Sequence, residues 1–179
     1  MTQAARPAPY DAARAELGGQ RVAVVGSGRT GLSAVRFLRR VGARVAVTDS
    51  RAAPPGVAEL PTDPPLEALD LGGLDGCLLA AQDLVVASPG VPLADRAFAL
   101  ARAAGVPIVG DVELFGRYAP APVVAITGSN GKSTVTRLVG AMFASAERQV
   151  AVGGNLGTPA LDLLADPAPA AYVLEVSSF

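Results

Sequence analysis

The stretch Val123–Thr134 reads VVAITGSNGKST and predicts the architecture of the second half of the chain. Its first four residues are apolar and mostly β-branched, which is typical of a buried strand. A loop containing Gly128 and Gly131 follows, and Lys132-Ser133 then opens a segment with apolar residues at helical spacing. This order of elements favours polyphosphate binding, because glycines let backbone N–H groups converge and a helix N-terminus carries partial positive charge.

The loop residues have distinct expected roles in binding ATP. Lys132 is expected to reach the β- and γ-phosphates, and the Ser133 hydroxyl is expected to ligate Mg²⁺. The pattern is G-x-x-G-K-S, shorter than the standard phosphate loop, since Ile126 stands where the first glycine would be. A plain strand-to-helix turn with a solvated lysine stays open as an alternative. The predicted ATP-binding residues are Gly128, Ser129, Asn130, Gly131, Lys132, Ser133 and Thr134.

A second glycine motif, GSGRTG at Gly26–Gly31, lies nearer the N-terminus. It follows an apolar run at 22–25 and precedes a helical pattern at 32–41, and the next apolar strand ends at Asp49. A βαβ unit of this kind, with an acid at the end of its second strand, is typical of a Rossmann-like nucleotide-binding domain. Two alternatives remain: tight packing without a ligand, and Asp49 as an ordinary turn residue.

The rest of the chain suggests where one domain ends and another begins. Ser88-Pro89-Gly90 ends a further predicted strand, at the sheet edge where α/β folds bind ligands. We predict a short helix and turn at 66–76 and a short helix at 158–164, and the linker at 119–122 reads APAP. We therefore expect a Rossmann-like domain with a parallel sheet in residues 1–119. Residues 120–179 should form the first part of a phosphate-loop α/β domain, because they hold too little sheet to bury both faces.

Glu175 interrupts the last predicted strand, which is otherwise apolar over 172–176. A carboxylate within a buried strand is costly unless it is paired or bound to a metal. Close to a phosphate loop, the expected partner is Mg²⁺. The alternative is an edge strand whose Glu175 faces water.

Composition excludes several classes of function. Lys plus Arg (15) nearly balances Asp plus Glu (16), so no basic face for nucleic acid is expected. The chain has no histidine, which leaves carboxylates, lysine, hydroxyls and Mg²⁺ for any chemistry. Cys77 is the single cysteine, which excludes a disulfide, and we expect it to be buried. No apolar stretch is long enough for a membrane span, and we expect a cytoplasmic monomer.

Taken together, the motifs resemble the Mur ligases of bacterial cell-wall (peptidoglycan) synthesis. They occur in the family's order over nearly the whole chain from Val22: GSGRTGLS (26–33), SPGV (88–91), GDVELF (110–115), AITGSNGKSTVT (125–136), GGNLG (153–157) and LEVSSF (174–179). The stretch DVELF favours the branch that adds D-glutamate. The resemblance implies three domains in the complete enzyme, which hold the UDP-sugar substrate, ATP and the incoming amino acid.

The resemblance also implies that the first glycine motif binds UDP and not NAD. Arg29 and Thr30 would lie at the pyrophosphate, although the family's loop is usually more apolar where Arg29 stands. The remaining UDP-substrate residues would be Asp49, Ser50 and Arg51 around the uracil, and Gly90 near the uridine diphosphate. In the ATP-binding part, the implied catalytic residues are Lys132 at the phosphates, Asn155 at the muramoyl group, and Glu175, which would bind Mg²⁺ together with Ser133.

The implied reaction has two steps. The carboxylate of UDP-N-acetylmuramoyl-L-alanine attacks the γ-phosphate of ATP to form an acyl phosphate, and the D-glutamate amine then displaces phosphate. Mg²⁺ and Lys132 would neutralise the charge that gathers at the γ-phosphate. The family's second metal site and its D-glutamate domain come after residue 179, so we expect this polypeptide not to complete catalysis alone.

Three other functions remain open. An NAD-dependent oxidoreductase would use residues 26–49 but leaves the second glycine loop unexplained. A non-catalytic nucleotide-binding module would bind nucleotide without chemistry. A different Mur ligase would add L-alanine or a diamino acid, and the domain that would decide between amino acids is not in this sequence.

Overall fold

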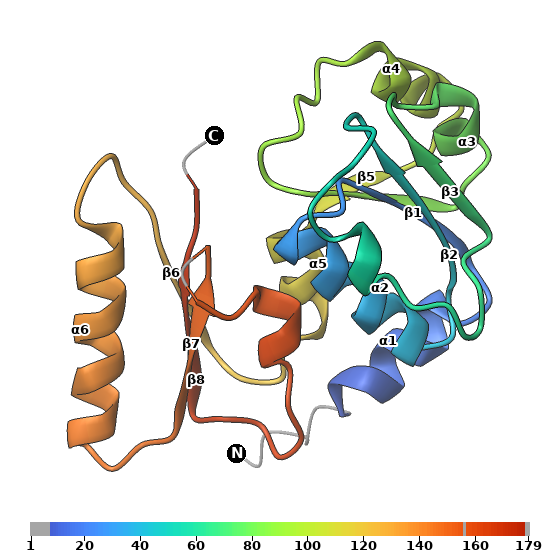
Figure 1. The fold of residues 1–179 in the computed structure, drawn as a ribbon. Helices are drawn as coiled ribbons and strands as arrows, with labels where there is room; N and C mark the ends of the chain where they lie inside the picture. Colours follow the sequence, from blue (N-terminus) through green and yellow to red (C-terminus); the bar gives the residue numbers. More distant parts are fainter. Residues whose placement is uncertain (1–7, 156, 178–179) are drawn as a thin grey trace.

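The structure is a computed structural model that describes residues 8–155 and 157–177. Leu156 of the GGNLG motif and Ser178-Phe179 of the LEVSSF motif lie outside the described residues. The described chain forms two parallel sheets, one before and one after the stretch 119–122 (Figure 1). Residues 8–118 are called the first unit below, and residues 123–177 the second unit.

The first unit is a five-stranded parallel sheet in the order β3-β2-β1-β4-β5. Its strands are β1 (Arg21–Val25), β2 (Arg44–Asp49), β3 (Ala68–Leu71), β4 (Leu84–Ala87) and β5 (Ile108–Gly110). Its helices are α1 (Pro9–Leu17), α2 (Arg29–Arg40), the short 3₁₀ turn η1 (Val57–Glu59), α3 (Gly76–Ala80), α4 (Arg96–Ala103) and α5 (Asp111–Tyr118). The strand order reverses between β1 and β4, which is the place where open α/β sheets bind ligands. The predicted Rossmann-like α/β fold is confirmed.

Side chains of β1 alternate between two hydrophobic clusters, one on each face of the sheet. Val22 and Val24 belong to the cluster that includes residues of α1, α2 and α5. Ala23 and Val25 belong to the cluster that includes residues of α3 and α4. Because successive residues of a strand point to opposite faces, this continuous apolar run buries the centre of the sheet on both sides.

The second unit is a three-stranded parallel sheet in the order β6-β8-β7. It contains β6 (Val123–Ile126), α6 (Lys132–Ser145), β7 (Val150–Gly154), the 3₁₀ turn η2 (Ala160–Leu163) and β8 (Ala171–Glu175). Since β8 lies between β6 and β7, Glu175 is on the central strand, and the alternative that placed it on an edge strand is wrong. Figure 1 shows α6 on the side of this sheet that faces away from the first unit.

The outward side of α6 is unusually apolar. Val135, Leu138 and Met142 are 45%, 60% and 63% exposed, whereas Thr136 and Gly140 face inward and are buried. A helix normally packs its apolar stripe against another element. The described residues supply nothing to cover this side of α6.

The two units share one hydrophobic core across the stretch 119–122. Leu161 and Leu164 belong to the same buried cluster as the residues of α2 and α5. The rings of Phe115 and Tyr172 meet edge-to-face with their centroids 5.0 Å apart. In Figure 1 the short orange-red helix formed by η2 lies between the second sheet and the first unit. The predicted domain boundary at 119/120 stays a prediction, because the sheets separate there but the core does not.

Three local predictions were wrong. Residues 68–71, predicted as helix and turn, form β3, because backbone pairing with β2 orders an edge strand that has no β-branched residue. Cys77 is exposed because it faces away from the sheet in α3, whose buried apolar residue is Leu79. The short helix predicted from Thr158 is a 3₁₀ turn with Pro159 at its N-cap position.

The described residues include no helix with the length and apolar character that crossing a bilayer requires.

The shared core predicts that the two units unfold together. Phe115→Ala should lower the free energy of unfolding by about 3–5 kcal/mol, since it removes a fully buried ring from the contact between the units. Urea unfolding followed by circular dichroism measures this change. Met142→Ala is the control and should change stability by less than about 0.5 kcal/mol, because Met142 is exposed. Two separate transitions in the wild-type protein would contradict a shared core.

Candidate functional site

A pocket of about 420 Å³ lies at the switch point of the first sheet. Most of its lining comes from the loops that follow β1, β2 and β4, the strands whose carboxyl ends meet at this edge, and Leu74 after β3 completes it. The structure brings together here all the residues predicted for the UDP-substrate, namely Arg29, Thr30, Asp49, Ser50, Arg51 and Gly90. Their contact with a ligand stays a prediction.

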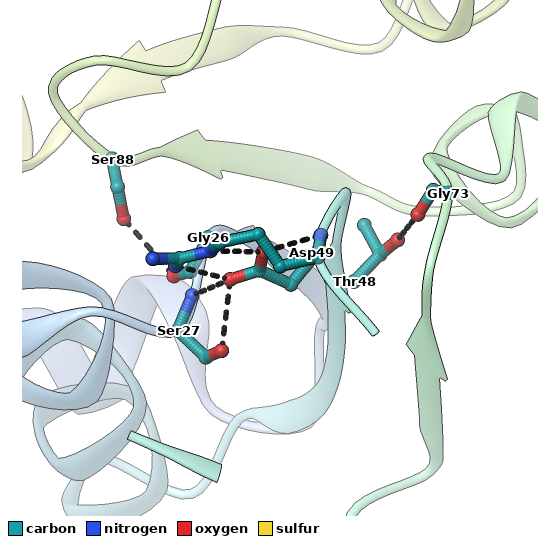
Figure 2. Close-up of polar contacts among 7 residues, drawn as sticks. Gly26, Ser27, Thr48, Asp49, Gly73 and Ser88 are labelled. Carbon is teal, nitrogen blue, oxygen red and sulfur yellow. Dashed lines mark hydrogen bonds and ion pairs between the residues drawn. The ribbon is translucent and has the colours of Figure 1, made fainter. Parts of the chain in front are cut away.

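The turn after β1 requires glycine at two positions. Gly26 has φ +92°, in the left-handed region that favours glycine. A Cβ on Gly31 would lie 1.8 Å from the Gly26 carbonyl oxygen, so only glycine lets α2 approach the end of β1. The Ser88 hydroxyl donates a hydrogen bond to the same Gly26 oxygen at 3.1 Å (Figure 2), which ties the loop after β4 to this turn.

The carboxylate of Asp49 accepts hydrogen bonds from both sides. The Ser27 backbone N–H and hydroxyl donate to its Oδ2 at 2.7 and 2.9 Å (Figure 2). Arg51 donates from Nε and its backbone N–H to Oδ1 at 2.9 and 3.0 Å, and from Nη2 to Oδ2 at 2.8 Å. The Arg51 guanidinium, followed by the N–H and O–H groups of Ser27, holds the pKa of Asp49 well below its ordinary value.

These contacts assign Asp49 a structural part in the site. Its side chain is 2% exposed, and five donors already use the lone pairs of its two oxygens. In a dinucleotide-binding fold the acid at this position must accept hydrogen bonds from ribose hydroxyls. Asp49 instead fixes the Ser27 turn and orients Arg51 at the pocket.

The loop after β6 is shaped by two glycines with positive φ, Gly128 (+147°) and Gly131 (+74°). Gly131 is the N-cap of α6, and Lys132 is the first residue of that helix. The Lys132 ammonium donates to the Gly128 carbonyl oxygen at 2.7 Å, so it already lies over the loop. Lys132 is the single lysine of the chain, and the other basic residues are arginines.

Ser133 and Glu175 form the polar contact that joins α6 to β8. The Ser133 hydroxyl donates to Glu175 Oε2 at 2.6 Å, and Glu175 is 8% exposed. Parallel pairing of Ile126 with Glu175 places the carboxylate next to the start of the phosphate loop. A hydroxyl and a carboxylate are hard oxygen donors, and Mg²⁺ at nucleotide sites takes one or two protein oxygens plus phosphate and water. The pair therefore fits Mg²⁺ by the chemistry of its donors.

No group of three or more acidic, cysteine or histidine side chains in the described chain could hold a metal ion by itself. A metal at Ser133 and Glu175 would consequently need further ligands from a bound nucleotide and from water.

A second pocket, of about 400 Å³, lies between the first glycine turn and the loop that follows β7. It is lined by Arg29, Thr30, Pro89 and Gly90 from the first unit, and by Gly154, Asn155, Gly157, Pro159 and Ser177 from the second. Asn155 donates from its backbone N–H to the Glu175 carbonyl at 2.9 Å and from Nδ2 to the Ser177 hydroxyl at 2.5 Å. Asn155 thus lies between the strand that carries Glu175 and the pocket lined by Arg29.

A third pocket, of about 410 Å³, lies beside these two and is mainly apolar. It shares Ser88 with the first pocket and Asn155 with the second, and Asp111 lines it. Burial raises the pKa of the Asp111 carboxyl, and the backbone N–H groups at the start of α5 oppose that shift.

Sequence reasoning missed four residues that build these sites: Ser27, Ser88, Gly157 and Ser177. Ser27 and Ser88 lie within the motifs GSGRTGLS and SPGV. The sequence signal for Ser27 was a hydroxyl between two turn glycines, and the signal for Ser88 was a hydroxyl at the end of a strand. The part played by Gly157 depends on a contact with a residue 128 positions away, which no local pattern reveals.

Comparison with known proteins finds Mur ligases both among similar sequences and among similar structures. The family described as "Mur ligase MurD-like, N-terminal domain" matches residues 20–110. The UDP-N-acetylmuramoylalanine–D-glutamate ligase of Nitrosococcus oceani is 56% identical over 156 residues, which is 87% of this chain and 34% of the relative. The ligase of the same name from Sodalis glossinidius is 57% identical over 161 residues, 90% of this chain and 36% of the relative.

Solved structures support the fold. A murein peptide ligase of Psychrobacter arcticus aligns with a TM-score of 0.54 at 17% identity, covering 88% of this chain and 37% of that protein. The UDP-N-acetylmuramate–alanine ligase of Thermotoga maritima aligns with a TM-score of 0.53 at 18% identity, covering 88% and 37%.

The Asp49 contacts predict a stability that depends on pH. Asp49→Asn should lower the free energy of unfolding at pH 7 by about 1.5–3 kcal/mol, the range for hydrogen bonds to a charged group. Because the folded pKa of Asp49 lies below its ordinary value of 3.8, its stabilisation is complete above that value. It should be lost as the pH falls further toward the folded pKa.

Urea denaturation at several pH values between about 3 and 7 measures the difference between wild type and variant. Asp83→Asn is the matched control, because Asp83 pairs with Arg21 at an exposed position and should contribute less. A difference that stays constant down to pH 3 would show that the ionised Asp49 is not the stabilising group.

Proposed function

We propose a function from one premise: this chain belongs to the MurD-like family of Mur ligases. We infer that it carries the UDP-substrate site and the ATP phosphate loop of the ligase that adds D-glutamate to UDP-N-acetylmuramoyl-L-alanine. The observation that carries the proposal is the pocket lined from both units, which connects the UDP-side residues Arg29 and Thr30 with Asn155 beside Glu175.

The chain spans about a third of the length of the curated relatives that it matches, 34% and 36% for the two described above. The activity, both substrates and the nucleotide are therefore proposals about the protein to which this chain corresponds. We propose that the 179-residue chain binds UDP and MgATP but does not complete ligation.

The described residues suit each part of the first chemical step. The Lys132 ammonium needs only to exchange the Gly128 carbonyl for phosphate oxygens, because its partner is neutral. The partial positive charge of the α6 N-terminus acts in the same direction. Mg²⁺, held by Ser133 and Glu175, would supply charge neutralisation at the β- and γ-phosphates.

In the proposed step, a carboxylate oxygen of the UDP-substrate forms a bond to the γ-phosphorus of ATP. The bond between that phosphorus and the β–γ bridging oxygen breaks, and its electron pair leaves with ADP. The amine of D-glutamate then attacks the acyl carbon, loses a proton and expels inorganic phosphate. No protein nucleophile takes part, which agrees with a chain that has no histidine and an exposed Cys77 outside the pockets.

The competing functions are weaker. The oxidoreductase is not favoured, because the family match covers the first glycine motif and Asp49 has no free acceptor for a ribose. A ligase for L-alanine or a diamino acid is disfavoured by the names of relatives that are 56–57% identical. A non-catalytic nucleotide-binding module makes the same prediction for this chain alone, namely binding without ligation. The two functions differ in the complete protein, where only the proposed ligase forms the amide bond.

We also propose that the protein acts in the cytoplasm as a monomer, with no nucleic acid or membrane partner. The near balance of charge and the UDP-linked substrate support this proposal.

The single lysine gives a direct test of ATP binding. An amine-reactive reagent can label only Lys132 and the N-terminus, and peptide mass spectrometry separates the two products. We expect MgATP to slow labelling of Lys132 at least about tenfold when the nucleotide is present at ten times its Kd or more. The N-terminal amine serves as the internal control. Equal labelling of Lys132 with and without saturating MgATP would contradict the proposed phosphate loop.

The Mg²⁺ site predicts a specific loss of metal dependence. In wild type, ATP should bind more tightly with Mg²⁺ than with excess chelator. Glu175→Gln should reduce this ratio about tenfold or more, because an amide is a poor ligand for a hard cation. Isothermal titration calorimetry measures both affinities. Glu147→Gln, at an exposed position after α6, should leave the ratio unchanged, and an unchanged ratio in Glu175→Gln would exclude Glu175 as a metal ligand.

A further inference from the structure

Arg29 is a charged residue within the first glycine motif. It is the first residue of α2, its side chain is exposed, and it lines both the switch-point pocket and the pocket between the units. Its Nη2 donates a hydrogen bond of 2.6 Å to the carbonyl oxygen of Gly157 in the second unit. A side chain of the first unit therefore holds the loop that follows β7.

A second arginine of α2 makes a different contact with the same region. Arg36, two helical turns after Arg29, pairs with the carboxylate of Asp162 through Nη2 at 2.5 Å and Nε at 3.4 Å. Residues seven positions apart lie on the same side of a helix. Arg36 is thus a charge-paired link between the units, and it lines neither of the two pockets.

Most N–H groups of the Arg29 guanidinium remain available for a further hydrogen-bond acceptor. A guanidinium has five N–H groups, and the contact with Gly157 uses one of them on a neutral acceptor. Among residues 8–155 and 157–177, Arg29 forms no ion pair, whereas Arg51 donates hydrogen bonds from Nε and Nη2 to the Asp49 carboxylate. Of the two arginines in the switch-point pocket, Arg29 is the one whose positive charge and remaining N–H groups are available to bind an anion.

The loop that Arg29 touches carries Asn155. On the side of the second sheet, this loop is fixed by the Gly154 N–H on the Thr158 carbonyl at 2.8 Å and by the Asn155 N–H on the Glu175 carbonyl at 2.9 Å. On the side of the first unit, the hydrogen bond that the described residues give this loop comes from Arg29. Whatever strengthens or weakens that hydrogen bond acts on the loop that holds Asn155.

We propose that Arg29 is a positioning residue that binds the diphosphate of the UDP-substrate and the Gly157 carbonyl at the same time. Diphosphate binding in the first unit then restricts the guanidinium and, through Gly157, orders the Asn155 loop of the second unit. The coupling is reciprocal, so an ordered loop also raises affinity for the diphosphate. This inference rests on the proposed function of the first pocket as a UDP site.

Hydrogen–deuterium exchange of this chain tests the coupling with two probes, UDP and uridine, which differ in the diphosphate. In wild type, saturating UDP should slow exchange of the Gly154 and Asn155 amides at least about threefold, a modest coupling. Uridine at saturation should not, because it offers Arg29 no phosphate.

Arg29→Leu should weaken UDP binding about five- to tenfold, as expected for losing charge-assisted hydrogen bonds. It should also abolish the slowing of loop exchange when UDP is raised to saturation. The matched control is Arg36→Leu, which removes another link between the units and should keep both UDP affinity, within about twofold, and the loop response. Exchange of β1 amides verifies that each variant is folded.

Loop protection by UDP that persists in Arg29→Leu would overturn the proposal, and so would bound UDP that leaves the loop of the wild-type protein unprotected. Failure of the wild type to bind UDP at all is a separate result. It would contradict the proposed UDP site, and therefore also the coupling that depends on UDP binding there.

Discussion

The close approach of backbone to backbone at the carboxyl ends of parallel strands is the constraint on which the rest of the structure depends. A Cβ on Gly31 would lie 1.8 Å from the Gly26 carbonyl, and a Cβ on Gly154 would lie 2.3 Å from the Glu175 carbonyl. Any larger residue at either position would push α2 or the end of β7 outward. In both units, glycine brings a turn within reach of polar groups at the end of a neighbouring strand.

The two units treat their acidic strand ends differently. Asp49 is neutralised by Arg51, and its lone pairs are used within the protein, so its charge fixes the shape of the first turn. Glu175 and Lys132 each have a neutral partner in the described chain, the Ser133 hydroxyl and the Gly128 carbonyl. Neither contact is an ion pair, so the charges of Lys132 and Glu175 are not compensated by these partners and can act on a phosphate and its metal ion. Arg29 belongs to this second group, because its hydrogen-bond partner among the described residues is the neutral carbonyl of Gly157 in the other unit.

Local patterns were enough to predict most of the fold and the set of residues that meet at the switch-point pocket. The first glycine motif, the apolar run before it and Asp49 after it lie within about 30 residues, the length of a βαβ unit. Glu175 lies 42 residues after its partner Ser133 and was noticed because it interrupts an apolar strand. What the sequence could not reveal depends on distant contacts. β3 exists because β2 offers a backbone to pair with, and the shared core exists because Phe115 meets Tyr172. The contact of Arg29 with Gly157, from opposite halves of the chain, follows from how α2 packs against η2.

The central claim is that the two glycine turns hold two phosphate-bearing ligands on the same chain, close enough for their reactive ends to meet. Phosphorus-31 relaxation of bound UDP, with Mn²⁺-ATP in place of MgATP, tests it most directly, because the paramagnetic effect falls steeply with distance. The account predicts that Mn²⁺ at Ser133 and Glu175 broadens the signals of the UDP diphosphate in a complex with both ligands bound. Both ligands bound to the same chain, with the UDP signals unaffected by Mn²⁺, would contradict it.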